Sequence, residues 1–192
     1  MKDFKMDCTS SYVISAFGMA FFATYAIGNV VLPPFADKFG RKKILVGSLI
    51  GCWISYIAIL LLPYQTWSIY VIIAIFAFGG FISAGRMMVG YCFMMEFAPK
   101  KYTGYMSTIW NMHDSITTVW TILFYRYVNK DWHYTLYWCV VLQTITLFNI
   151  IFFIPESPKW LYDQKRWKEL LKVMTYMAKK NKKTLKSSAI IE

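Results

Sequence analysis

The chain has 192 residues, of which 57% are hydrophobic and only 16% are charged, and yet its formal net charge is +11. A soluble domain of this size is less apolar and more evenly charged, so this composition excludes an ordinary water-soluble protein and favours apolar membrane spans with basic flanks. A nucleic-acid-binding protein carries its basic residues as a patch on a solvated domain. Here the lysines and arginines lie beside long apolar runs, so we expect the lipid bilayer as a partner and no nucleic acid.

Five stretches are long enough to cross the hydrocarbon core, which takes about 20 mostly apolar residues. We predict transmembrane spans over residues 11–35, 44–62, 69–94, 103–127 and 134–154. The loops between them are short, so consecutive helices should run antiparallel. The expected domains are an extracellular segment over residues 1–10, a transmembrane bundle over residues 11–154 and a basic cytoplasmic tail over residues 155–192.

The positions of the Lys and Arg residues predict the orientation of the bundle. If the loop over residues 37–43 is cytoplasmic, alternation places the loop at 96–101 and the C-terminal tail on the same side. That side then holds most of the 21 basic residues. Because basic loops stay in the cytoplasm, we predict that the N-terminus lies outside and the C-terminus inside. We expect the plasma membrane, with an organelle membrane as the alternative.

The tail begins with a strong helix-start signal. Ser157 followed by Pro158 is typical of an N-cap residue and a first helical residue. Apolar residues then recur from Trp160 to Met177 with the spacing of one helix face. We therefore predict a basic amphipathic helix or helix pair that lies along the cytoplasmic face, against the bundle or against anionic lipid.

Three short motifs lie at helix ends that this topology places on one side of the membrane. The first, Asp37-Lys-Phe-Gly-Arg-Lys-Lys43, joins the first two spans. The second begins with Arg86-Met-Met-Val-Gly90 and continues as Glu96-Phe-Ala-Pro99. The third, Pro155-Glu-Ser-Pro-Lys-Trp-Leu161, follows the last span. Together they resemble the signatures of the major facilitator superfamily. Residues 4–8 and 170–181 further resemble organic cation/carnitine transporters, with sugar porters as the second choice.

This resemblance implies an all-α membrane fold. The five spans would be helices two to six of the N-terminal six-helix bundle, without the first helix and without the C-terminal half, followed by cytoplasmic amphipathic helices. Gly40 permits a tight turn between the first two spans, and Asp37 and Arg41 can form charge-assisted bonds there. The resemblance assigns a cytoplasmic gating motif to Asp37, Gly40, Arg41 and Lys42, and a charge network to Arg86, Glu96 and Glu156.

The fourth span carries a polar stripe. Ser107, Asn111, Asp114, Thr118 and Thr121 recur every three or four residues, so they share one helix face. Lipid would penalise this face, and we predict that it lines the bundle interior or a wet cavity. Asp114 is about ten residues from the cytoplasmic end of the span, or roughly 15 Å, which places it near the midplane.

A carboxylate at that depth is a functional candidate, which could attract a cationic ligand or carry a proton. The alternative is a structural bond from Asp114 to His113 or Arg126. Aromatic side chains could form walls for a cation. The candidates for the substrate pathway are Asp114, Asn111, Trp110, Thr118 and Tyr25.

Two hypotheses of different classes follow. The first is a partial secondary active transporter, whose parent moves a small organic cation or carnitine-like solute by alternating access. The chain would act together with a missing C-terminal half or another membrane subunit. A sugar-type porter fragment is the alternative. The second is a non-transporting structural subunit of a membrane assembly. We expect no enzyme, because paired catalytic carboxylates, an H-E-x-x-H motif and a nucleophile elbow are absent from the sequence. We also expect no cofactor and no metal site.

Overall fold

The computed structural model describes residues 11–63 and 68–181. The predicted extracellular segment and the tail beyond residue 181 lie outside the described residues. Every regular element within the described ranges is helical, which confirms the all-α prediction. The elements are α1 (Ser11–Phe39), α2 (Arg41–Leu61), α3 (Ser68–Ala84), the π-helical turn η3 (Gly85–Val89), α4 (Gly90–Phe97), the 3-10 turn η4 (Lys100–Tyr102), α5 (Thr103–Tyr127), α6 (Trp132–Phe153), α7 (Pro158–Asp163) and α8 (Trp167–Lys180).

Within the described part of the chain, four helices are long and apolar enough to cross a membrane. They cover Ser15–Phe39, Arg41–Leu61, Ser68–Phe97 and Trp132–Phe153. The fifth predicted span does form a helix, because α5 is 25 residues long. Its polar residues, however, lower its mean hydropathy, so α5 is not among the four helices that qualify by composition. Length and composition thus support four of the five predicted spans, and the span over residues 103–127, which forms a helix of membrane length, stays a prediction.

The helices α1 and α3 pack closely through glycine. A Cβ atom at Gly28 would lie 2.5 Å from the carbonyl oxygen of Phe81, and one at Gly80 would overlap the carbonyl oxygen of Phe21. The Thr24 hydroxyl, on α1, donates a hydrogen bond of 2.6 Å to a backbone carbonyl of α3. Without a hydrophobic drive between helices in lipid, such close backbone contact is what holds them together.

A second set of contacts joins α2 to α4 and α6. The buried cluster consists of Ala36, Leu45, Leu49, Val89 and Phe93. Polar bonds link α2 to α6: the Gln143 amide donates to the Leu49 carbonyl at 3.0 Å, and the Trp53 indole donates to the Thr144 hydroxyl at 3.0 Å. By contrast, neither α5 nor α6 contributes a fully buried residue, so one side of the bundle is open.

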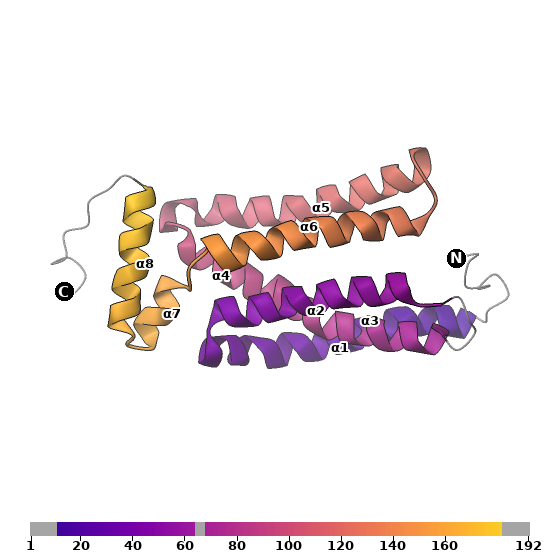
Figure 1. Ribbon diagram of the computed structural model, residues 1–192, viewed down its shortest axis with the longest axis horizontal. Helices are drawn as coiled ribbons and strands as arrows, with labels where there is room; N and C mark the ends of the chain where they lie inside the picture. Colours follow the sequence, from indigo (N-terminus) through magenta and orange to yellow (C-terminus); the bar gives the residue numbers. More distant parts are fainter. Residues whose placement is uncertain (1–10, 64–67, 182–192) are drawn as a thin grey trace.

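The helices α7 and α8 lie across the end of the bundle at which α1 turns into α2 (Figure 1). We call this the Gly40 end. Trp160 and Leu161 on α7 and Leu170 on α8 form a small buried cluster there. The Ser157 hydroxyl caps α7 by accepting a hydrogen bond of 3.3 Å from the Trp160 backbone N–H, as the Ser-Pro signal predicts.

Candidate functional site

The loop between the first two spans is a single residue. Helix α1 continues through Pro33 and Pro34 to Phe39, and α2 begins at Arg41. Gly40 between them has φ 109° and ψ 139°, a conformation that side chains other than glycine disfavour. This turn brings the polar residues at the end of α1 and the start of α2 close together.

Arg41 is the centre of the charges at the Gly40 end. Its guanidinium forms an ion pair with Asp37 at 3.1 Å and a second, shorter ion pair with Glu96 on α4. The Glu96 side chain is only 6% exposed. A buried carboxylate of this kind depends on its paired cation to offset the cost of desolvation. The pair therefore ties the start of α2 to the end of α4.

Helix α7 closes over the same turn. The Glu156 carboxylate accepts a hydrogen bond of 2.8 Å from the backbone N–H of Lys42, in the first turn of α2. The Trp160 indole N–H donates to the backbone carbonyl of Asp37 at 2.7 Å, and Lys42 Nζ donates to the Ile151 carbonyl at 3.0 Å. We call the contacts of Glu156 and Trp160 with the Gly40 turn the clamp. A carboxylate at a helix start is favourable because it meets free N–H groups and the positive end of the helix dipole.

The sequence-predicted gating and charge residues therefore gather at one place, with one exception. Asp37, Arg41, Glu96 and Glu156 all meet at the Gly40 turn, whereas Arg86 forms no ion pair with either glutamate. Arg86 instead lies within the π-helical turn η3, away from the Gly40 turn. The role of Trp160 in holding the turn was not predicted; its sequence signals were its place in the Pro155–Leu161 motif and on the apolar face of the tail helix.

The polar stripe of α5 is covered by the other described helices only at its two ends, where Ser107 bonds to the Tyr91 hydroxyl of α4 at 3.1 Å and Thr121 lines a pocket between α5 and α6. Asn111, Asp114 and Thr118 are exposed, and Ser107 and Thr121 are half-buried. The amide of Asn111 and the hydroxyls of Thr118 and Thr121 each donate to the backbone carbonyl four residues earlier in α5. This back-bonding satisfies most of the stripe within its own helix.

Two members of the stripe lie outside this back-bonding: Ser107, which bonds to Tyr91 instead, and Asp114. The Asp114 side chain is 53% exposed, and its one ionisable contact is the adjacent His113, whose Nδ1 lies 4.0 Å from the carboxylate. No ion pair joins it to Arg126, whose guanidinium instead lies over the Tyr127 ring. Among the described residues the Asp114 carboxylate thus has only this adjacent contact, on a largely exposed face of α5.

The other pathway candidates are divided between two faces. Trp110 lines a cavity of about 760 Å³ between α2, α4, α5, α6 and α8, and its ring packs edge-on against Tyr91. Tyr25 lies on α1, stacked on Phe21, and is not part of that cavity lining. The structure therefore does not bring Tyr25 and Trp110 together around one cation.

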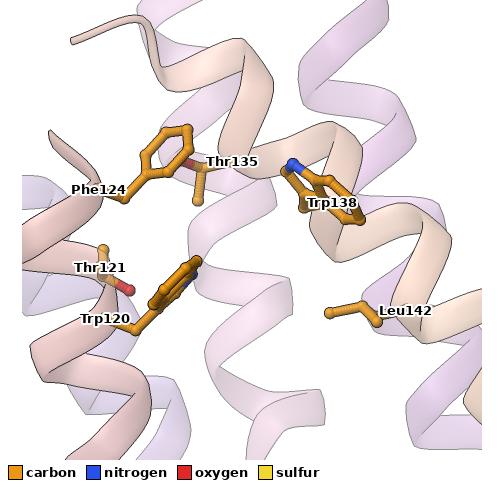
Figure 2. A pocket seen from close by; sticks show the side chains of 6 residues that line it. All are labelled: Trp120, Thr121, Phe124, Thr135, Trp138 and Leu142. Carbon is orange, nitrogen blue, oxygen red and sulfur yellow. The ribbon is translucent and has the colours of Figure 1, made fainter. Parts of the chain in front are cut away.

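A smaller pocket of about 270 Å³ lies between α5 and α6 (Figure 2). Its walls are Trp120, Thr121, Phe124, Thr135, Trp138 and Leu142. The Thr135 hydroxyl is buried there without a hydrogen-bond partner. Aromatic side chains that open into such a pocket leave apolar surface available to a further helix or a ligand.

These features define a multi-pass helical membrane protein with a charged clamp at one end of its bundle. A family model described as Major Facilitator Superfamily matches residues 1–190, so the chain belongs to this superfamily of transporters rather than to a family of enzymes.

The curated relatives are all much longer than this chain. Solute carrier family 22 member 1 of Bos taurus is 27% identical over 187 residues, which are 94% of this chain and 31% of that protein. Solute carrier family 22 member 2 of Mus musculus is 27% identical over 186 residues, covering 95% of this chain and 32% of the relative. The Homo sapiens member 2 is 26% identical over 194 residues, with 97% and 32% covered. The chain thus spans about a third of the length of the curated relatives it matches.

Proposed function

We propose that this chain is part of a secondary active transporter, whose complete form moves a small organic cation or carnitine-like solute by alternating access. Membership of the Major Facilitator Superfamily supports the transporter class. The relatives named solute carrier family 22 and the resemblance to organic cation/carnitine transporters support the substrate class. Alternating access needs two bundles that rock around a midplane site, and this chain supplies less than one of them.

Asp114 is the observation on which this proposal depends. Its carboxylate is about half exposed on the polar face of α5, and no hydrogen bond from a described residue reaches it. A charge near the bilayer midplane is too costly to face lipid, so such residues face a water-filled path or another helix. Because a carboxylate attracts cations, a path along this face of α5 favours a positively charged solute.

The open side of the bundle supports the need for a further membrane segment. The described helices leave the middle of the polar face of α5 exposed, from Asn111 to Thr118. The missing C-terminal half, or another membrane subunit, would cover this face and complete the pathway. We propose the plasma membrane as the site of action, with an organelle membrane as the alternative, and the Gly40 end as the cytoplasmic end.

The clamp would act as the inner latch of the transport cycle. Asp37, Gly40, Arg41 and Lys42 form the gating motif, and Glu96 and Glu156 hold it through the bonds described above. Helix α7 would then keep the Gly40 turn in one conformation while the cytoplasmic side is closed. A structural subunit without transport is the alternative function, favoured by Pro33 and Thr103, which replace the glycine and arginine of the superfamily pattern.

The test is uptake of a labelled quaternary ammonium ion by cells that express the full reading frame encoding this chain. We expect Asp114→Asn to abolish uptake while the protein still reaches the membrane, because the neutral amide removes the attraction for the cation. Asp163→Asn, outside the spans at the end of α7, is the matched control and should leave uptake unchanged. Equal uptake by the Asp114→Asn variant would remove this carboxylate from the mechanism, and absence of any uptake by the wild type would favour the structural subunit.

A further inference from the structure

The larger cavity has a cationic lining without a balancing acid. Its charged or polar side chains are Arg86, His113, Gln143 and Lys180, together with Thr146 and Tyr176. No Asp or Glu is among the described residues that line it, and its remaining walls are mostly apolar. The cavity therefore suits a ligand with an apolar body and a negative group.

Arg86 is the unusual member of this lining. Its Nε atom is buried and has no hydrogen-bond partner, and its guanidinium makes no ion pair with a described residue. The residue as a whole is half-buried and lines the cavity. A partly desolvated guanidinium without a counter-charge gains from an anion placed there.

The depth of Arg86 limits what that anion is. Arg86 is 11 residues before Phe97, the end of α4, which places it roughly 16 Å along the helix from the Gly40 end. A phospholipid headgroup stays at the interface and does not reach this depth. Lys180, which is held over the rings of Phe153 and Tyr176 on the way in, provides a second positive charge along the entry from that end.

We propose that this cavity binds a carboxylate, with the negative group on Arg86 and an apolar body against Phe93 and Trp110. The carboxylate comes either from a free organic acid or from a side chain of a further helix. A planar guanidinium binds a carboxylate through two parallel hydrogen bonds. A carboxylate therefore suits Arg86 better than a monatomic anion does. The proposal goes beyond the cation pathway at Asp114 and does not rest on it, because Asp114 is not part of this lining.

The test measures binding rather than transport, so it stands apart from the uptake experiment. The whole chain is placed in nanodiscs of neutral phosphatidylcholine, and the fluorescence of dansylglycine is followed as the probe concentration rises. Dansylcadaverine, which carries the same fluorophore and the opposite charge, is the control ligand. We expect saturable binding of dansylglycine, and Arg86→Gln should weaken it by about tenfold to a hundredfold.

Two further variants keep the result interpretable. Arg86→Lys keeps the charge and should restore part of the affinity, and Arg126→Gln, outside this cavity lining, should bind like the wild type. Helical circular dichroism of each variant shows whether it is folded. Equal affinity of Arg86→Gln and wild type, or equal binding of both probes, would overturn the proposal.

A second arm identifies the source of the carboxylate. The same titration is repeated with the full reading frame that encodes the chain. Binding to both forms identifies a free organic acid as the ligand. Binding that occurs with the chain alone and is lost in the full reading frame identifies a carboxylate supplied by another segment.

Discussion

Replacing Gly40 by alanine tests whether the clamp holds the bundle together. Gly40 has φ 109° and ψ 139°, and a Cβ atom at this position would lie 2.8 Å from Oε2 of Glu156. The methyl group would therefore strain the turn and push the Glu156 carboxylate away from the backbone N–H of Lys42, with which it now makes a bond of 2.8 Å.

The magnitude follows from these two effects. A non-glycine residue in this backbone region costs about 1–3 kcal/mol. A hydrogen bond to a charged acceptor contributes about 1.5–3 kcal/mol. The two effects share one relaxation, so they are not additive, and we expect Gly40→Ala to lower the free energy of unfolding by about 2–4 kcal/mol.

The assay is thermal denaturation of the purified chain in a mild detergent, followed by helical circular dichroism. A loss of this size lowers the midpoint by roughly 4–16 °C for a chain of this length. Gly47→Ala is the matched control, because a Cβ atom at Gly47 has nothing within 4 Å. The control should raise stability by about 0.5–1 kcal/mol, since alanine favours the helix. An unchanged midpoint for Gly40→Ala, or an equal loss in both variants, would refute the reasoning.

Two other contacts give predictions of the same kind. Gly80→Ala should lower the free energy of unfolding by about 1–3 kcal/mol, because its Cβ would overlap the Phe21 carbonyl and push α1 away from α3; Gly79→Ala, with nothing within 4 Å, should not. Trp160→Phe keeps an aromatic ring but loses both the indole bond to the Asp37 carbonyl and part of the buried packing of Trp160, and should cost about 1–3 kcal/mol.

Both are measured by the same thermal denaturation as Gly40→Ala. Equal midpoints for the two neighbouring glycine variants would show that α1 and α3 do not meet as closely as described. A Trp160→Phe variant as stable as the wild type would show that the ring, rather than its N–H, accounts for the contribution of this tryptophan to the clamp.

The helices themselves were predictable from the sequence because their signals are local. A run of about 20 apolar residues forms a helix in lipid whatever lies beside it, and the Ser157-Pro158 pair starts α7 through its own capping bond. The loop motif placed Asp37 and Arg41 on either side of the Gly40 turn, four residues apart. The length of the segment over residues 103–127 and the helical spacing of its polar residues likewise predicted α5.

The partners of the charges were decided by the tertiary structure. Arg41 meets Glu96 only because α2 packs on α4, and Glu156 caps α2 only because α7 folds back over the Gly40 turn. Arg86, by contrast, was expected in the charge network. It lies in a π-helical turn, where the number of residues per turn differs from that of an α-helix, so residue spacing alone does not predict its direction. The sequence gives the order of the charged residues along the chain. The energy of pairing them depends on the distances between helices, and the packing of glycines and apolar side chains determines those distances.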